Sequence, residues 1–255
     1  MTSISADGRL AIVTGTSSGI GAALARALLE QGWSVVGMAR RDAGFDNLRY
    51  RHVAVDLGDL DALHQAAEGV LSPLLSEDRW KRVALVNNAA VSGEAKGLED
   101  VEPEALQRLL AVNTVAPVYL MGLVARVTPP AAALRIVNVS SGAAVRAFPG
   151  LGDYCSSKAA LRMAGMALAA ELDSELRPGG RRENAAVFSY EPGVVDTPMQ
   201  TASRARSLEE FPWGQPFKDF AAQGLLAKPE DVIGEIVDFV AGDGHERFVE
   251  RRYGG

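Results

Sequence analysis

Few residues in this chain suit metal binding or covalent cross-linking. The 255 residues include a single cysteine, Cys155, so the chain cannot form an internal disulfide. The three histidines, His52, His64 and His245, lie far apart and show no metal-ligand spacing. We therefore expect no metal site and a reducing environment for this protein.

The chain also lacks an excess of basic residues and a long hydrophobic run. Lys plus Arg number 26 against 32 for Asp plus Glu, and the net charge of −6 argues against a nucleic-acid partner. No stretch approaches the ~18 uninterrupted apolar residues of a membrane span. The first ten residues do not resemble a signal peptide. With 47% hydrophobic residues, the sequence predicts a globular cytoplasmic protein.

Short aliphatic runs alternate with longer amphipathic stretches along the whole chain. Strands separated by helices imply βαβ crossovers, and hence a parallel sheet with helices on both faces. The sequence therefore predicts an α/β fold, a doubly wound parallel sheet in one domain spanning 1–255. The expected strands are 10–14, 34–38, 52–55, 83–87, 134–139 and 185–190, and the expected helices include 20–31, 105–126 and 154–176.

Two segments break this alternation. Residues 177–184 are rich in glycine and charge, which predicts an exposed turn. Residues 198–224 have weak periodicity but carry several aromatic side chains, which favours a flap over a substrate pocket. A surface segment held by its own aromatic residues is an equal alternative. The aromatic candidates for the pocket are Phe148, Phe211, Trp213 and Phe217.

A glycine-rich turn, TGTSSGIG, follows the first expected strand and opens a helix. Glycine lets the backbone approach a pyrophosphate, and the helix N-terminus adds free N–H groups and partial positive charge. The spacing G-x-x-x-G-x-G differs from the commonest dinucleotide fingerprint, but the flanking strand and helix supply its context. The predicted cofactor contacts in this turn are Gly15, Ser17, Ser18, Gly19, Ile20 and Gly21.

The same turn also matches G-x-S-x-G, the nucleophile elbow of serine hydrolases. Ser17 would be the nucleophile, and His245 lies downstream as the order requires. The elbow normally comes later in the sheet than the first strand, and a hydrolase leaves the motifs below unexplained. A serine hydrolase is thus a remote alternative.

The end of the second expected strand indicates which dinucleotide binds. An acid there holds the ribose hydroxyls of NAD, whereas arginine suits the 2′-phosphate of NADP. Here Ala39 stands where an acid would be, followed by Arg40 and Arg41. The sequence favours NADP with Arg40 as the phosphate ligand, although two solvated arginines would look the same.

Tyr154 and Lys158 lie four residues apart and so share one helical face. A tyrosine loses its proton near pH ~10, and a neighbouring ammonium lowers that pKa, which makes a usable general acid. Ser141 follows a buried strand, where open parallel sheets bind their ligands. Taken alone, Y-x-x-x-K could equally be two surface residues on a helix.

Together these motifs resemble the classical short-chain dehydrogenases/reductases, and the resemblance covers essentially the whole chain. It implies a Rossmann fold, NADP(H) and a homodimer formed through helices 105–126 and 154–176. The matching segments, in the family's order, are TGTSSGIG, Asp56-Leu57, NNAA at 87–90, Asn113, Ser141, YCSSK at 154–158, and Pro192-Gly193 with Thr197.

The resemblance also implies roles for individual residues. Tyr154 would donate the proton, while Lys158 would lower its pKa and hold the nicotinamide ribose. Ser141 would hydrogen-bond the substrate carbonyl, and Asn113 would hold a water that relays protons to Lys158. Asp56 would contact adenine. The remaining implied cofactor contacts are Leu57, Asn88, Ala89, Pro192, Gly193, Val195 and Thr197.

Within the family, the chain looks most like the sepiapterin reductase and benzil reductase branch, on Tyr154-Cys155 and the run PGVVDTPMQ. The resemblance therefore implies an NADPH-dependent reductase of a ketone or vicinal dicarbonyl. The alternatives are an alcohol dehydrogenase of another substrate class and a non-catalytic NADP-binding regulator. Three residues depart from the family pattern: Ala90 replaces glycine, Ser18 is not basic, and Glu191 is a charge for which the sequence offers no explanation.

Overall fold

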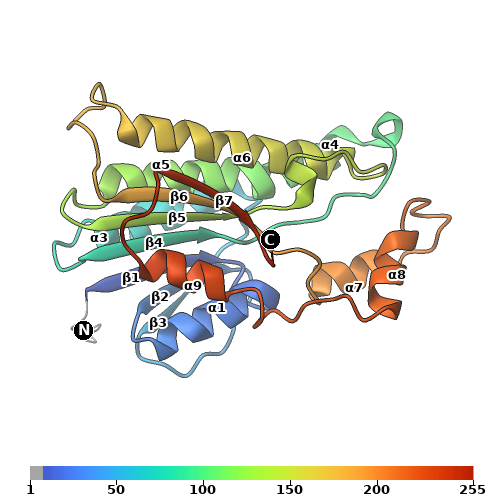
Figure 1. Ribbon diagram of the computed structural model, residues 1–255, viewed down its shortest axis with the longest axis horizontal. Coiled ribbons are helices and arrows are strands. Elements are labelled where there is room, and N and C mark those ends of the chain that lie inside the picture. The colour runs from blue at the N-terminus through green and yellow to red at the C-terminus, as the bar shows by residue number, and fades with distance from the viewer. Residues whose placement is uncertain (1–7, 255) are drawn as a thin grey trace.

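The computed structural model describes residues 8–254 and is built on one seven-stranded parallel sheet, in the order β3-β2-β1-β4-β5-β6-β7 (Figure 1). The six predicted strands are confirmed to within two residues, and a seventh, β7, was not predicted. Residues 1–7, to which most of the signal-peptide expectation applies, lie outside the described residues. The strands are β1 (Arg9–Thr14), β2 (Ser34–Ala39), β3 (Tyr50–Ala54), β4 (Arg82–Asn87), β5 (Ala133–Val139), β6 (Ala185–Glu191) and β7 (Phe248–Arg252).

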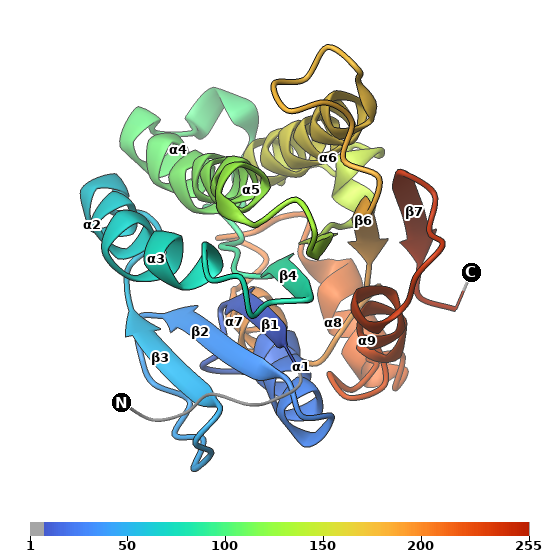
Figure 2. The same cartoon turned by 90° about the vertical axis from the view of Figure 1, so that its left-hand side faces the viewer.

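Helices cover both faces of the sheet, with α5 and α6 on one face and α1 and α9 on the other (Figure 2). Alternate residues of β1 enter the two cores, Leu10 and Ile12 on one face and Ala11 and Val13 on the other. This two-sided burial explains the continuous aliphatic strands. The helices are α1 (Gly19–Glu30), α2 (Leu60–Ala66), α3 (Ser72–Leu75), α4 (Pro103–Leu110), α5 (Ala116–Val127), α6 (Gly152–Asp173), α7 (Pro198–Ala205), α8 (Gln215–Ala222) and α9 (Gly234–Ala241).

The helix expected over 105–126 is interrupted by a π-helical turn, Ala111–Val115. Pro117 has no N–H, so it cannot close an α-helical bond to the carbonyl of Asn113, and the backbone widens there. By length and hydropathy the whole stretch Pro103–Val127 could span a membrane. More than half of its most apolar window is buried inside the protein, as in a core helix.

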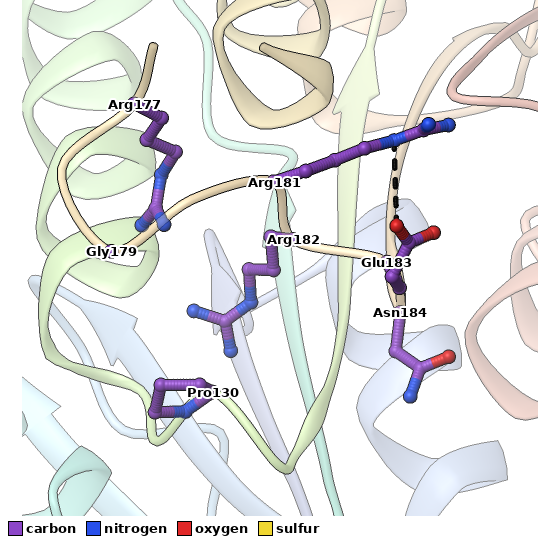
Figure 3. Close-up of a pocket in the computed structure, with 7 residues that line it drawn as sticks. All are labelled: Pro130, Arg177, Gly179, Arg181, Arg182, Glu183 and Asn184. Carbon is purple, nitrogen blue, oxygen red and sulfur yellow. Dashed lines mark ion pairs between the residues drawn. The ribbon is translucent and has the colours of Figure 1, made fainter. Parts of the chain in front are cut away.

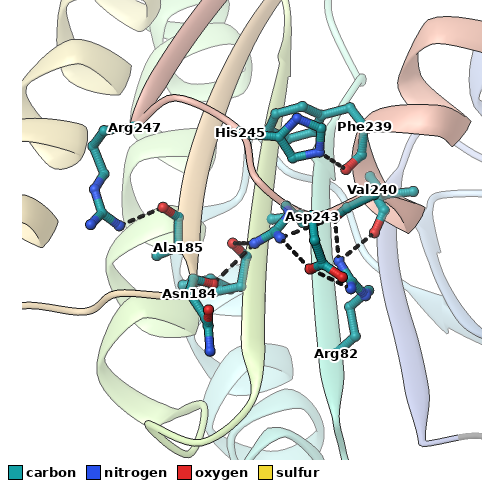
Figure 4. Close-up of polar contacts among 11 residues, drawn as sticks. Arg82, Asn184, Ala185, Phe239, Val240, Asp243, His245 and Arg247 are labelled. Carbon is teal, nitrogen blue, oxygen red and sulfur yellow. Dashed lines mark hydrogen bonds and ion pairs between the residues drawn. The ribbon is translucent and has the colours of Figure 1, made fainter.

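Arginine side chains close the amino-terminal edge of the sheet (Figure 4). Arg135 is buried; it donates to the carbonyls of Asn184 at 3.0 Å and Gly242 at 3.0 Å, and it pairs with Asp243 at 3.0 Å. Arg82 pairs with the same carboxylate at 2.7 Å. The Asp243 carboxylate is thereby paired with the guanidiniums of both Arg82 and Arg135. Burial in the protein lowers the pKa of Arg135.

The expectation that 177–184 is an exposed turn is wrong for Arg182, which is only 4% exposed. Its guanidinium donates to the carbonyls of Thr128 at 3.1 Å and Pro129 at 2.9 Å, just beyond the carboxyl end of α5, where a cation complements the helix dipole. Arg177 donates to the carbonyl of Ala125 at 3.1 Å. Both arginines line a cavity of about 180 Å³ (Figure 3). We assign these arginines a structural role, because they cap backbone carbonyls.

Candidate active site

The predicted site residues gather at the carboxyl-terminal edge of the sheet. Six of these positions each follow a different strand, and because all the strands are parallel, their carboxyl ends meet at one edge. The glycine turn follows β1, Arg40 follows β2, Asp56 follows β3, Asn88 follows β4, Ser141 follows β5, and Pro192 follows β6.

The glycine turn is a tight cradle that excludes side chains. Gly15 and Gly19 have φ values of +75° and +57°, which strain any residue with a Cβ. A Cβ on Gly21 would lie 2.5 Å from Nδ2 of Asn88 and would clash with the carbonyl oxygen of Gly15. The side chain of Ser18, at the N-cap of α1, makes no capping bond. A close backbone followed by an uncapped helix N-terminus suits a pyrophosphate.

We expect Gly21→Ala to lower the free energy of unfolding by about 2 kcal/mol, the usual cost of overpacking, and to weaken dinucleotide binding. Urea denaturation and a fluorescence titration measure the two effects. Gly122→Ala is the matched control, since Gly122 also lies in a helix but has no atom within 4 Å of an added Cβ. It should raise stability by up to about 1 kcal/mol. Equal losses in both variants would contradict the close packing at Gly21.

The loop after β4 is tied to the glycine turn by Thr14, which sequence reasoning did not single out. Its Oγ1 accepts hydrogen bonds from the backbone N–H groups of Asn88 at 2.9 Å and Ala89 at 3.0 Å. The Asn88 side chain donates to the Thr14 carbonyl at 2.8 Å. Ala90 has no positive φ, so its Cβ causes no backbone strain there. Asn88 thus braces the turn directly.

The segment after β6 passes over the same turn. Gly193 has a φ of +75° and Val195 is buried, bridged to Ala227. Thr197 caps α7, accepting from the N–H of Gln200 at 3.4 Å. A Cβ on Gly19 would lie 3.1 Å from Cγ2 of Thr197. The structure therefore brings Thr197 next to the glycine turn, as the shared motif implied.

The residues expected at the adenine end of the cofactor differ in burial. Asp56 accepts from the N–H of Gly58 at 2.9 Å and lies 3.9 Å from the guanidinium of Arg108, with its carboxylate partly exposed. Leu57 is buried in the core, as is Ile20 in the opposite core. The side chains of these two residues therefore pack the protein interior.

Asn113 lies in the π-helical turn and is fully buried. Its Nδ2 donates to the Val91 carbonyl at 2.9 Å and to Ser157 Oγ at 3.1 Å, and its Oδ1 accepts from the Val91 N–H at 2.9 Å. The side chain is thereby occupied in holding the loop after β4.

Ser141, Tyr154 and Lys158 come together between β5 and the first turns of α6. The Ser141 side chain lies near the Tyr154 hydroxyl and acts to lower the pKa of that tyrosine. Ser141 Oγ also accepts from the N–H of Ala143 at 3.2 Å, which fixes the short 3₁₀ turn Gly142–Ala144. Lys158 Nζ donates to the Val139 carbonyl at 2.8 Å and lies 5.7 Å from the centre of the Tyr154 ring.

The expectation of a lowered tyrosine pKa is wrong for this structure. Burial raises the pKa of Tyr154 to about 12, and the Ser141 side chain offsets only part of this. Burial also lowers the pKa of Lys158 to about 8. The low-dielectric surroundings disfavour both charged forms, and the ammonium is directed at a carbonyl. Tyr154 therefore keeps its proton at neutral pH.

A family model for short chain dehydrogenases matches residues 9–208 of this chain. The chain belongs to the short-chain dehydrogenase/reductase family. The resemblance found in the sequence motifs is thus confirmed, and with it an oxidoreductase built on a Rossmann-type sheet.

Three characterised members are similar to this dehydrogenase. Benzil reductase ((S)-benzoin forming) of Bacillus subtilis (strain 168) is 32% identical over 91% of this chain and 93% of its own. L-xylulose reductase of Homo sapiens is 36% identical over 90% and 88% of the two chains, and sepiapterin reductase of Bos taurus is 31% identical over 78% of each. The expected branch is therefore confirmed.

A solved structure of 4-hydroxyisoleucine dehydrogenase complexed with NADH shares the fold of this dehydrogenase. Its TM-score is 0.75 at 21% identity, and the match covers 96% of each chain. Likeness at this identity supports the architecture alone.

The serine hydrolase hypothesis is wrong. Ser17 follows the carboxyl end of β1, whereas His245 precedes the amino end of the parallel strand β7, so the two lie at opposite edges of the sheet. His245 Nε2 is hydrogen-bonded to the carbonyl of Phe239 at 3.0 Å (Figure 4). His245 therefore cannot act as a general base for Ser17.

Residues 198–224 form two short helices, α7 and α8, beyond the carboxyl ends of the strands (Figure 1). Arg206 joins the segment to the loop after β4, donating to the carbonyls of Glu94 at 2.6 Å and Gly93 at 3.1 Å. A lone arginine on an irregular segment gave no signal in the sequence. The segment is thus anchored to one wall of the catalytic site.

The aromatic candidates for the substrate pocket divide into two groups. Phe211 is 1% exposed; its ring lies 5.6 Å from that of Phe217, and it packs against Gly150, just before α6. Trp213 and Phe148 are both exposed. Phe211 therefore belongs to the segment's own core, while Trp213 and Phe148 have free ring surface.

Proposed function

We propose that this protein is an NADPH-dependent reductase of ketones or vicinal dicarbonyls. The observation that carries the proposal is the placement of Ser141 and protonated Tyr154 next to each other, beside the Lys158 ammonium. Two hydroxyl donors at the carboxyl end of a strand suit a carbonyl oxygen that becomes an alcohol. The carbonyl-reducing relatives support the same chemistry.

The roles of the catalytic side chains follow from their environments. Bound NADPH would supply the hydride to the carbonyl carbon. Ser141 would donate a hydrogen bond to the substrate oxygen, and Tyr154 would transfer its proton to that oxygen, which completes the alcohol. Lys158 would hold the nicotinamide ribose and favour the tyrosinate left behind. The Asn113 side chain is already hydrogen-bonded to Val91, and Pro117 has no N–H to donate to the main-chain carbonyl of Asn113. That carbonyl would therefore be the acceptor for a water that relays protons.

We propose NADP(H) rather than NAD(H) as the cofactor. The glycine cradle and the uncapped end of α1 fit a pyrophosphate. Buried Ala39 ends β2 without a carboxylate, and the exposed Arg40 follows it. The nearby carboxylate of Asp42 accepts from the N–H of Gly44 at 3.0 Å instead. Arg40 is thus free to bind a 2′-phosphate as a planar fork.

We expect Arg40→Ala to weaken NADPH binding by about tenfold or more, because a charge-assisted pair is lost, and to leave NADH binding nearly unchanged. Fluorescence titration with each dinucleotide measures both affinities. Arg51→Ala, which removes another exposed arginine from β3, is the control and should alter neither. Equal losses for NADPH and NADH would remove Arg40 from this role.

A panel of ketones and diketones, including benzil, tests the proposed function through the loss of NADPH absorbance. Rapid reduction of at least one carbonyl compound supports it. Oxidation of alcohols without any carbonyl reduction would favour an alcohol dehydrogenase of another class. Tight NADPH binding without turnover of any compound would favour a non-catalytic regulator.

We further propose that 1–255 acts as one catalytic domain, with 198–224 as the flap over the substrate. A cytoplasmic homodimer is the expected form of the enzyme. The helices expected at the interface carry exposed apolar side chains, including Val118 on α5 and Met163 on α6, which is 59% exposed.

A further inference from the structure

Glu191, which the sequence left unexplained, lies beside the catalytic serine. It ends β6, and the neighbouring strand is joined to it where the N–H of Ser140 donates to the Tyr190 carbonyl at 2.7 Å. The carboxylate is 20% exposed, and one oxygen lies 3.3 Å from Nη2 of Arg146 and 3.4 Å from Nε of Arg252. Glu191 therefore binds two arginines that come from different parts of the chain.

The two guanidiniums are only partly used by this carboxylate. Arg146 is 53% exposed and Arg252 is 57% exposed, and each reaches Glu191 through one nitrogen. A guanidinium offers five N–H donors, so both retain donors for another acceptor. Two cations that share one carboxylate leave a net charge of +1.

Other carboxylates nearby do not remove this excess. Glu250 lies two residues before Arg252 on β7. It accepts two hydrogen bonds from Arg162, at 2.6 and 2.7 Å. Glu235 lies 4.0 Å from Arg251. Each of these carboxylates therefore already has its own cation.

The charged cluster adjoins the reaction site. Ser141, Glu191 and Arg252 line one cavity of about 190 Å³. A Cβ on Gly142 would clash with the guanidinium of Arg146, so glycine at this position lets that guanidinium lie against the backbone next to Ser141. A molecule whose carbonyl is bound at Ser141 thus has the guanidinium of Arg252 within the same cavity, which Glu250 and Arg251 also line. Arg146 lies next to this cavity, paired with Glu191.

We propose that the substrate carries an anionic group, a carboxylate, that Arg146 and Arg252 bind while the carbonyl lies at Ser141. Glu191 acts as a positioning residue that holds both guanidiniums together. A substrate cation fits less well, because the Glu191 carboxylate already has two positive partners. The inference rests on the proposed carbonyl reduction and specifies its substrate class as keto acids, among which an α-keto acid is itself a vicinal dicarbonyl.

The test compares keto acids with their methyl esters, which present the same reducible ketone without the charge. Aryl α-, γ- and δ-keto acids cover different distances between the two groups. For the best-fitting acid, we expect wild-type kcat/KM to exceed that of its ester by about tenfold or more, as charge-assisted bonds to a carboxylate imply. High salt should reduce this ratio.

Arg146→Met and Arg252→Met should each lower the acid-to-ester ratio by about tenfold, chiefly through KM for the acid. Both side chains are more than half exposed, and the ester rate in the same variant reports whether the catalytic site is intact. Arg181→Met is the matched control: this arginine pairs with Asp173 and Glu183 at the opposite edge of the sheet (Figure 3). The acid-to-ester ratio of the Arg181→Met variant should equal that of the wild type.

Three results would overturn the inference while leaving carbonyl reduction in place, and two of them come from the acid-to-ester comparison. One is that every ester is reduced as well as its acid; the other is that neither arginine substitution changes the ratio. A wild-type preference for an amino ketone over the acids would also overturn it. If NADPH reduces none of the ketones, diketones, acids or esters, the proposed function itself fails, and this inference fails with it.

Discussion

Tyr154→Phe is expected to lower the rate of carbonyl reduction by about 100-fold or more, the usual contribution of a positioned general acid. The substitution keeps the ring but removes the hydroxyl that lies near Ser141. Hydride transfer then leaves an alkoxide without its proton source. Steady-state kinetics on the best ketone of the panel measures the loss in kcat, and a fluorescence titration should show NADPH affinity unchanged.

Tyr119→Phe is the control for this experiment. Its hydroxyl lies on α5, hydrogen-bonded to His64 at 2.8 Å and Glu68 at 3.3 Å, so the same atom is removed away from the catalytic residues. Its kcat should match the wild type. If the Tyr154 variant retains most of its activity, Tyr154 is not the proton donor.

Lys158→Met is expected to abolish most of the activity and also to weaken NADPH binding. Lys158 is buried beside Tyr154, and its ammonium would serve both the tyrosinate and the ribose. The two losses distinguish it from Tyr154→Phe, which affects turnover alone. Lys81→Met, an exposed lysine before β4, should change neither quantity. Unaltered NADPH affinity in the Lys158 variant would disprove its ribose role.

The pH dependence of the wild type gives a second measurement on Lys158. Its pKa is lowered to about 8, so the side chain is charged below that pH and neutral above it. We expect kcat/KM for NADPH, which reports groups of the free enzyme, to fall as pH rises through about 8. The residual activity of Lys158→Met should show no such decline. A wild-type profile that is flat across this range would contradict the assignment.

Six strands, including the edge strand β3, could be predicted from the sequence, whereas the edge strand β7 could not. Runs such as 83–86 are wholly apolar because helices cover both sides of β4. Strand β7 reads FVERR; it pairs on one side with β6, and its last three residues face solvent. It therefore has no continuous apolar run. The glycine turn, Ser141, Tyr154 and Lys158 were also predictable, because each motif depends on short spacings within one or two elements.

The sequence by itself determined the family, the parallel α/β fold and the positions that follow each strand, since these depend on local spacing and hydrophobic pattern. Only the tertiary structure decided the protonation of Tyr154 and the partners of Glu191. Burial raises the pKa of Tyr154 to about 12, although the neighbouring lysine alone indicated the opposite direction. Arg146 and Arg252 meet at Glu191 only because β7 packs beside β6. Desolvation and charge pairing depend on residues distant in the chain, and no local pattern records them.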